Sequence, residues 1–431
     1  MKTVLLIPFA ALLITLILGV PIAFSLAFAG ILGVWLITGN PAMILSMLGM
    51  TTFTSYANFI LTTIPMFILM AFLSASSGLA EDLYDAASKW LSHIRGGLGI
   101  GTVFACMIFG AMSGAAVACA SVMTSIALPN MRRLGYSEVF SVGAIGVGSV
   151  LDILIPPSVM FIVYGIATET SIGKLLIAGI GPGLVLGVFL IAVVMIWVRI
   201  RPQDAPPAQK VSWSVRWQSL WRIWPSMGLI LIVLGLLYTG IVTPTEVGAI
   251  GAFMAGVIGI ATRRLKWNGA VTAFRNAVRT TAMIFMIIIG ATMLGYFMAL
   301  SRVPQTVIIA VQEMHLNRYV VIVGIAVAYF VISMFMDELP LMLLTLQITF
   351  PLVMELGFDP VWFGVFNMML VSMGLVFPPV GMIAFVVSAT GKVDLATVYK
   401  GTTVFMFAIV ATTIILIIFP QIALWLPSTM H

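Results

Sequence analysis

Long apolar runs recur along this chain and constrain its fold more than any other feature. Residues 3–20, 21–39, 226–240 and 247–261 are examples, and none of them contains a charged side chain. Of the 431 residues, 61% are hydrophobic and 8% are charged, whereas soluble proteins carry about 25% charged residues. Because the bilayer interior offers the backbone no hydrogen-bond partners, runs of this length fold as helices. The sequence therefore predicts an all-α polytopic membrane protein with no soluble domain.

Half of the twenty Lys and Arg residues form two basic clusters, which predict the orientation of the chain. The first cluster holds Arg199, Arg201, Lys210, Arg216 and Arg222, and the second holds Arg263, Arg264, Lys266, Arg275 and Arg279. Two apolar runs lie between the clusters, so both clusters fall on one side of the membrane, which the positive-inside rule makes cytoplasmic. The clusters flank spans and lack interleaved stacking aromatics, so we expect no nucleic acid partner.

The chain repeats itself at a fixed offset. The segment "PNMRRLGYSEVF" begins at Pro129 and "PLVMELGFDPVW" begins at Pro351, which gives an offset of 351 − 129 = 222 residues. The same offset matches Gly135 with Gly357, Pro156-Pro157 with Pro378-Pro379, and Gly179 with Gly401. Prolines and glycines in register mean more than matching apolar residues, because each constrains the backbone.

Each repeat contains an apolar helix that a double proline interrupts, in "SVLDILIPPSVMFIVYG" and in "SMGLVFPPVGMIAFVVSATG". Proline disfavours helix at the preceding residue. Interrupted backbone at membrane depth is tolerated only where it is buried in protein or lines a water-filled cavity. Paired interrupted helices are typical of a transporter's binding site, where freed carbonyls bind Na⁺ and helix N-termini bind anions. We therefore expect two inverted repeats around such a site.

Seven motifs, met in order along nearly the whole chain, resemble one family. They are "FGAMSGAAVA", "LPNMRRLGY", "ILIPPSVMFIVYG", "SIGKLLIAGIGPG", "GIVTPTEVGAIGA", "MDELPLMLLTLQI" and "GLVFPPVGMIAF". These motifs are similar to those of the large membrane subunit of tripartite ATP-independent periplasmic (TRAP) transporters, the DctM-like M subunit. The TPTE turn and the two Pro-Pro segments are the most specific of them.

This resemblance implies a fold, a function and partners. The fold would be inverted repeats with two re-entrant helical hairpins, which form an elevator-type transport domain beside a scaffold. The function would be Na⁺-coupled import of an organic anion, a carboxylate, delivered by a periplasmic substrate-binding protein. The other partner would be a small four-helix membrane subunit, expected here as a separate chain, in the lipid of a bacterial or archaeal inner membrane.

We expect five units along the chain. They are residues 1–95, the N-terminal scaffold helices and an interfacial helix; 96–198, the first transport repeat with its hairpin; 199–280, the basic loops and a scaffold helix pair; 281–402, the second transport repeat with its hairpin; and 403–431, a C-terminal span.

The resemblance also implies two sodium sites and a substrate site. The first sodium site would take Ser113 with carbonyls near Asp152, Ile155 and Pro157. The second would take Asp337 or Thr345 with carbonyls near Gly374, Phe377 and Pro379, which the offset of 222 maps onto the first set. We expect the substrate to contact Ser113, Gly114, Ser158 and Arg132.

Two departures from the family pattern fall in the first sodium site. Ala115 and Ala116 stand where the family usually has hydroxyls, and Asp152-Ile153 stands where it usually has Gly-Pro. A carboxylate at bilayer depth costs about 2.5–3.5 kcal/mol on insertion scales. We hypothesise that Asp152 offsets the lost hydroxyls, either by binding the cation or by coupling a proton. The alternative is a structural acid that pairs with an Arg or caps a helix end.

Simpler interpretations of the other site residues stay open at this point. Asp337 and Glu338 are ordinary capping residues for a helix N-terminus. Ser113 with Gly114 is also typical of close helix packing, and Arg132 of a basic residue that reaches the membrane surface.

Other functions remain open as well. A stand-alone ion-coupled anion symporter would follow the same repeat logic without a binding protein. A membrane enzyme of lipid or isoprenoid metabolism would need clustered acids or histidines, which the sequence lacks, and paired broken helices suit an occluded site better than a channel. No P-loop and no catalytic constellation stands out. We expect no enzyme activity and no organic cofactor, only Na⁺.

Overall fold

The computed structural model describes residues 2–207 and 211–430, so Lys210 of the first basic cluster lies outside the described residues. Within these ranges every regular element is a helix. The N-terminal elements are α1 (Lys2–Ile17), α2 (Ile22–Thr38), α3 (Pro41–Tyr56), η1 (Phe59–Thr62), α4 (Thr63–Ser76) and α5 (Leu79–Leu91). The next are α6 (Gly97–Ser113), α7 (Ala116–Arg133), α8 (Glu138–Gly148), α9 (Leu151–Leu154), α10 (Val159–Thr168), α11 (Ile172–Ala178) and α12 (Ile180–Ile200).

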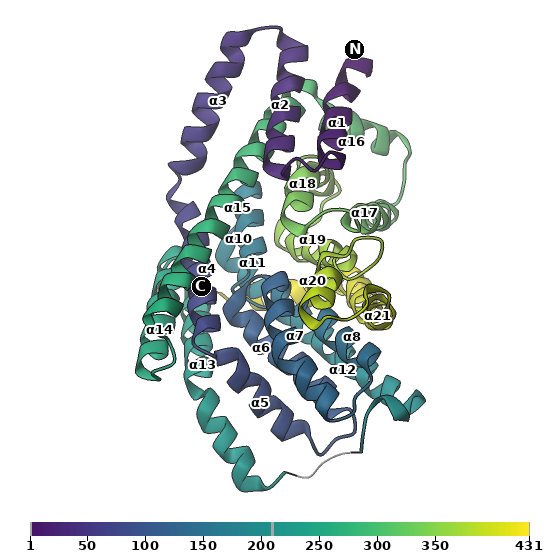
Figure 1. Cartoon of the computed structure of the whole chain (residues 1–431). Helices are drawn as coiled ribbons and strands as arrows, with labels where there is room; N and C mark the ends of the chain where they lie inside the picture. Colours follow the sequence, from purple (N-terminus) through teal and green to yellow (C-terminus); the bar gives the residue numbers. More distant parts are fainter. Residues whose placement is uncertain (1, 208–210, 431) are drawn as a thin grey trace.

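The second half of the chain has the same character (Figure 1). Its elements are η2 (Pro202–Asp204), α13 (Trp213–Thr239), α14 (Pro244–Ala261), α15 (Trp267–Ser301), α16 (Val303–Glu313), α17 (Arg318–Ser333), α18 (Glu338–Glu355), α19 (Pro360–Gly374), α20 (Met382–Gly391), α21 (Leu395–Ile418) and α22 (Gln421–Ser428). Within the described residues, seven helical segments are long and apolar enough to cross a membrane, and a bent segment over α8–α10 would make an eighth. This confirms the predicted polytopic membrane fold.

The repeat in the sequence is also a repeat of helices. Adding 222 to the bounds of α7 gives 338–355, which are the bounds of α18. The hairpin α6–α7 thus corresponds to the hairpin α17–α18, and α8–α10 corresponds to α19–α20. The double proline interrupts both repeats as predicted, with a bend of 41° between residues 138–154 and 159–168 in the first. Both Pro-Pro peptide bonds are cis.

The two repeats are inverted relative to each other. Ser137, just before α8, donates its backbone N–H to Asp204 in the loop of the first basic cluster. The equivalent residues before α19 contact a different part of the molecule, because the Pro360 carbonyl accepts a hydrogen bond of 2.9 Å from Tyr164 of α10. The residues that follow α10 gather with the α13–α14 turn, at the end of α13 away from the basic cluster. Equivalent residues thus lie on opposite faces, as inverted repeats require.

The helices outside the repeats pack closely through glycines. A Cβ at Gly30 of α2 would lie 2.5 Å from the backbone of Met293 in α15, and a Cβ at Gly290 would lie 2.3 Å from the Ala23 carbonyl oxygen. Helix α15 has 35 residues, about 52 Å of helix, and it runs diagonally up the molecule in Figure 1. It exceeds the thickness of a bilayer core, so it must tilt in the membrane.

The amphipathic helix expected near residue 90 is α5. It buries Leu79, Leu83 and Tyr84, and Trp90 donates a hydrogen bond of 3.1 Å to the Arg216 carbonyl in α13. Of the expected unit boundaries, 95/96 falls between α5 and α6, whereas 198/199, 280/281 and 402/403 fall inside α12, α15 and α21. The division into transport and scaffold units therefore stays a prediction.

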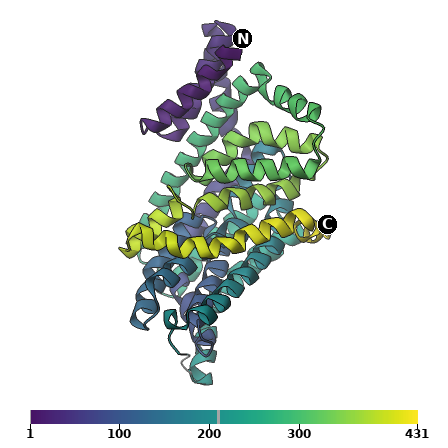
Figure 2. The ribbon, with the colours of Figure 1, turned by 90° about the vertical axis from the view of Figure 1, so that its right-hand side faces the viewer.

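Figure 2 shows the helices of the second repeat, in green to yellow, lying nearly side by side across the molecule. Trp362 and Phe366 of α19 stack at 5.0 Å between ring centroids within this layer, and both side chains are fully buried. Such large buried rings hold the repeat as one packed body.

Candidate functional site

The tip of the first hairpin docks onto the first interrupted segment. Ser113 ends α6, and Gly114 turns the chain into α7 with a positive φ of 62°. The Ser113 hydroxyl donates a hydrogen bond to the Asp152 carboxylate, and the backbone N–H of Ala115 donates to the same oxygen at 3.1 Å. The backbone N–H of Val159 returns a bond of 3.3 Å to the Gly114 carbonyl. A Cβ at Gly114 would lie 2.7 Å from the carbonyl oxygen of Pro157, so only glycine fits here.

Asp152 is fully buried in this contact. Its Oδ2 atom accepts both hydrogen bonds and so caps the N-terminus of α7, while its Oδ1 atom has no hydrogen-bond partner among the described residues. The hydroxyl of Ser158, also fully buried, lacks a partner in the same sense. The three ion pairs of the described chain involve other acids, so Asp152 has no Arg or Lys partner there. A buried unsatisfied polar atom costs about 1–3 kcal/mol, and a bound ligand would remove that cost.

Backbone carbonyls add further oxygen atoms to this region. In the described part of the chain, the carbonyls of Ile155 and Pro157 accept no hydrogen bond, and the same holds for Phe377 in the second repeat. Unwound carbonyls beside a buried carboxylate are oxygen ligands of the kind that coordinates Na⁺ in transporters with broken helices. The residues present therefore fit a monovalent cation at the first interrupted segment.

The second interrupted segment packs differently. Gly374 lies against Ser333 at the end of α17, where a Cβ would come within 2.2 Å of its atoms. Phe377 packs on Phe330, with ring centroids 5.3 Å apart. The carbonyl of Pro379 already accepts a hydrogen bond of 2.9 Å from the Tyr399 hydroxyl. Of the three predicted carbonyl positions, Phe377 is the one left without a hydrogen-bond donor in the described chain.

The acids of the second repeat sit on its hairpin tip. Asp337 caps α18 by accepting a hydrogen bond of 2.9 Å from the Glu338 N–H. Glu338 is buried, and its Oε2 atom has no partner among the described residues. Subtracting 222 from 337 and 338 gives Ala115 and Ala116, and adding 222 to Asp152 gives Gly374. The carboxylate lies on the interrupted segment in one repeat and on the hairpin tip in the other.

Glu338 is the residue that sequence reasoning undervalued. The available signal was the offset itself, which sets Asp337 and Glu338 opposite the two alanines that replace the hydroxyls usual in the family.

Thr345 does not lie at the second interrupted segment. It is seven residues into α18, about 10 Å along the helix axis from the tip. Its hydroxyl lies 2.5 Å from the Tyr329 hydroxyl, which also accepts a hydrogen bond of 2.8 Å from Asn367. The structure thus places Thr345 in a polar cluster between α17, α18 and α19, and it leaves Asp337 as the predicted side chain at the tip.

Arg132 lies far from the other predicted substrate residues. It is sixteen residues along α7 from Ala116, about 24 Å by helix rise. Its guanidinium pairs with Glu138 and donates a hydrogen bond of 3.1 Å to the Gly391 carbonyl at the end of α20. The structure brings Ser113, Gly114 and Ser158 together but not Arg132, so the simpler interpretation of a surface basic residue describes its position better.

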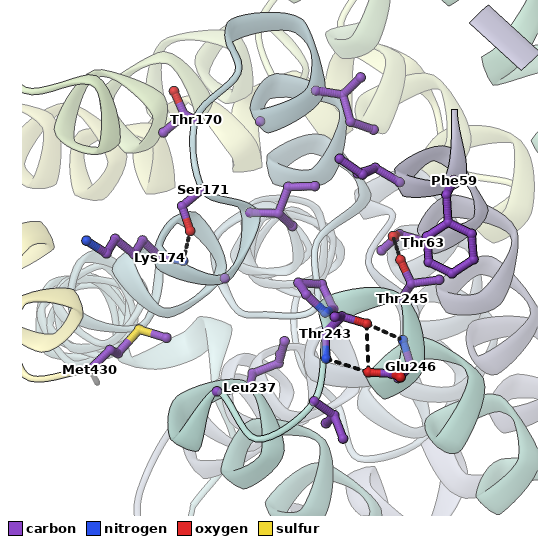
Figure 3. A pocket seen from close by; sticks show the side chains of 18 of the residues that line it. Phe59, Thr63, Thr170, Ser171, Lys174, Leu237, Thr243, Thr245, Glu246 and Met430 are labelled. Atoms are coloured by element: carbon purple, nitrogen blue, oxygen red, sulfur yellow. Dashed lines mark hydrogen bonds between the residues drawn. The ribbon is translucent and has the colours of Figure 1, made fainter. Parts of the chain in front are cut away.

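Two cavities open between the repeats and the other helices, at the ends of α13 and α10 away from the first basic cluster. The larger, of about 890 Å³, lies between the start of α4, the α10–α11 turn and the α13–α14 turn (Figure 3). There Thr63 and Thr245 share a hydrogen bond of 2.6 Å, and Thr243 and Glu246 form a capping box at the start of α14. This is the TPTE turn of the sequence.

The second cavity, of about 550 Å³, shares Asn58, Ile166 and Glu169 with the first. It is lined by Val163 of α10 and Leu343 of α18. Helix α10 begins directly after Ser158, and α18 begins at Glu338. The cavity therefore lies within about two helical turns of both unpaired side chains.

No group of three or more His, Cys, Asp or Glu side chains suited to a metal ion occurs in residues 2–207 and 211–430. A transition-metal centre is thus not what the described side chains form, and the oxygen-rich segment with one carboxylate suits a hard, weakly bound cation instead.

Comparison with known proteins supports the resemblance. Residues 9–422 match the family described as the DctM component of the tripartite ATP-independent periplasmic transporter. A C4-dicarboxylate TRAP transporter large permease protein DctM of Pseudomonas aeruginosa is 33% identical, over 88% of this chain and 89% of that protein. An ectoine TRAP transporter large permease protein of Halomonas elongata is also 33% identical, over 95% and 96%.

The solved structure of the YdaH transporter of Alcanivorax borkumensis resembles this one with a TM-score of 0.64 at 14% identity, over 88% of this chain and 89% of that chain. That likeness concerns the fold alone. The family match covers nearly the whole chain, and two relatives above 30% identity cover most of it. This chain therefore belongs to the DctM family of large permease subunits of TRAP transporters.

Proposed function

We propose that this chain is the large membrane subunit of a Na⁺-coupled secondary transporter that imports an organic anion. The observation that supports this most is the buried contact between Ser113, Ala115 and Asp152, which leaves Asp152 Oδ1 without a partner beside the carbonyls of Ile155 and Pro157. A cation bound there would neutralise the buried carboxylate. Because it would touch both the hairpin tip and the interrupted segment, it would also hold them together.

The substrate site would lie next to this cation. The N-termini of α7 and α10 meet at Ser113, Gly114 and Ser158, and helix N-termini favour anions. The unpaired Ser158 hydroxyl supplies a polar group that such an anion would need. A carboxylate is the class we propose, and the names of the two relatives above, dicarboxylate in one and ectoine in the other, leave its identity to experiment.

The partners follow from the family. Large permease subunits of TRAP transporters work with a small membrane subunit and a periplasmic binding protein, and we propose the same for this chain, with the small subunit as a separate protein. By the positive-inside rule the basic clusters face the cytoplasm of a prokaryotic inner membrane. The cavity of about 890 Å³ would then open to the periplasm, where a binding protein would release its cargo.

An elevator motion is the transport mechanism we propose. Both cavities separate helices of the repeats, α10, α11 and α18, from helices outside them, α4, α14 and α15. A rigid movement of the repeats along this boundary would carry the site between Ser113 and Ser158 across the membrane.

The test is uptake into proteoliposomes that contain this chain and its small subunit. A labelled carboxylate would be supplied with and without the matching binding protein, under an imposed Na⁺ or proton gradient. Uptake that requires both the Na⁺ gradient and the binding protein supports the proposal. Uptake without the binding protein would identify a stand-alone symporter, and uptake driven only by protons would remove the sodium assignment.

A further inference from the structure

A groove between α12 and α21 is lined mostly by apolar side chains and does not belong to the transport site. Its volume is about 910 Å³. The walls are Ile196 and Ile200 of α12 and Val404 and Phe407 of α21. Ile200 and Phe407 are 73% and 67% exposed, although they lie on helices that cross the membrane. Such a surface is apolar enough for hydrocarbon chains.

One end of this groove is basic. Arg201 and Lys400 line it there, and both side chains are exposed. Neither forms an ion pair within the described part of the chain. Of the acids on the neighbouring segments, Asp204 accepts a hydrogen bond of 2.7 Å from Trp197, and Asp394 precedes α21. The two cations are thus available to a ligand.

Polarity along the groove matches one kind of molecule. The basic end is level with the first basic cluster, because Arg201 is a member of that cluster and follows α12 directly. From there the walls run about 10 Å toward the membrane interior, from Ile200 to Val193 and from Lys400 to Phe407, by helix rise. Basic pockets between transmembrane helices on the cytoplasmic side suit anionic lipid headgroups.

We propose that this groove binds an anionic phospholipid of the inner leaflet. Its phosphate would lie between Arg201 and Lys400, and its acyl chains would lie along Ile196, Val404 and Phe407. One wall comes from each repeat, so the bound lipid would bridge the two repeats at the cytoplasmic surface.

Lipid binding to the purified complex of this chain and its small subunit tests the proposal. Native mass spectrometry would count the molecules of phosphatidylglycerol, or of phosphatidylcholine as the neutral probe, that remain bound. The double variant Arg201→Gln/Lys400→Gln removes the charges, and Val404→Trp fills the groove but keeps them. Arg222→Gln/Arg275→Gln is the matched control, because both are exposed members of the basic clusters and neither lines the groove.

We expect tighter retention of phosphatidylglycerol than of phosphatidylcholine by the unaltered complex. The double variant should weaken phosphatidylglycerol binding by about 30-fold, and Val404→Trp should reduce the number of bound lipids, whereas the control should behave like the parent. Equal phosphatidylglycerol binding by all four proteins would overturn the proposal. So would variants that keep the lipid but lose the small subunit, because the groove would then be a protein interface.

Discussion

At the scale of single residues, the site depends on a glycine that no other residue can replace. Gly114 and Gly135 both have positive φ, 62° and 82°, which costs an L-residue about 1–2 kcal/mol. They differ in their surroundings. A Cβ at Gly114 would lie 2.7 Å from the Pro157 carbonyl oxygen, whereas a Cβ at Gly135 would have nothing within 4 Å.

Gly114→Ala should therefore destabilise the protein more than Gly135→Ala does. The measurement is the melting temperature of the detergent-purified complex, together with uptake in proteoliposomes. Only Gly114→Ala should also reduce uptake, because it pushes the hairpin tip away from the interrupted segment. An equal loss of melting temperature and normal uptake in both variants would mean that the tip does not need its close contact with Pro157.

The residue scale is also where the sequence and the structure differ most. Ser113, Gly114, Asp152 and Ser158 meet as predicted, because chain breaks and special residue types mark them in the sequence. Thr345 and Arg132 lie elsewhere. Each is on a continuous helix, about 10 Å and 24 Å from its hairpin tip, and a family motif does not say how far along a helix a residue stands from a site.

At the scale of the elements, glycines set how closely the helices outside the repeats approach. A Cβ at Gly290 would lie 2.3 Å from the Ala23 carbonyl oxygen of α2, whereas Gly324 on α17 has nothing within 4 Å of the same position. Close approach of backbones through small residues is a main source of helix association in membranes.

Gly290→Ala should thus lower the melting temperature, because α2 and α15 would have to separate. Gly324→Ala is the matched control in a helix, and it should leave the melting temperature unchanged or raise it, since alanine stabilises helix interiors by about 0.5–1 kcal/mol over glycine. Scanning fluorimetry of the two variants gives the comparison. No change on Gly290→Ala would show that α2 and α15 have room to move apart.

The elements themselves were largely predictable from the sequence. The offset of 222 residues reproduces the bounds of α18 from those of α7, because the prolines and glycines that it matches impose the same breaks on both repeats. Where the units divide was not predictable. Helices α15 and α21 run through the expected boundaries at 280/281 and 402/403, and a continuous apolar helix carries no mark in its sequence where one packing partner replaces another.

At the scale of the whole molecule, the inverted repeats make a prediction about sidedness. His93 and His315 are 222 residues apart and both are exposed. Inverted repeats put them on opposite sides of the membrane. The two native cysteines, Cys106 and Cys119, are fully buried and should not react.

A membrane-impermeant thiol reagent added to intact cells should therefore label His315→Cys and not His93→Cys. Opened membranes should allow both to be labelled, and the parent chain should stay unlabelled in either case. Labelling of both variants in intact cells would mean that the repeats are parallel and that the orientation by the basic clusters is wrong.

The central claim is that Asp152 is part of the cation site. Asp152→Asn removes the charge but keeps an oxygen that accepts from Ser113 and Ala115, so the hairpin tip should stay docked. Asp85→Asn is the matched control, since Asp85 is a half-exposed acid of α5 in an ion pair with Lys89.

The measurement that tests this most directly is Na⁺-driven uptake by both variants in proteoliposomes, with the small subunit and the binding protein present. We predict that Asp152→Asn loses Na⁺-dependent uptake while it keeps the melting temperature of the complex, and that Asp85→Asn transports like the parent. Full Na⁺-driven uptake by Asp152→Asn would contradict the account and make this buried acid a helix cap only.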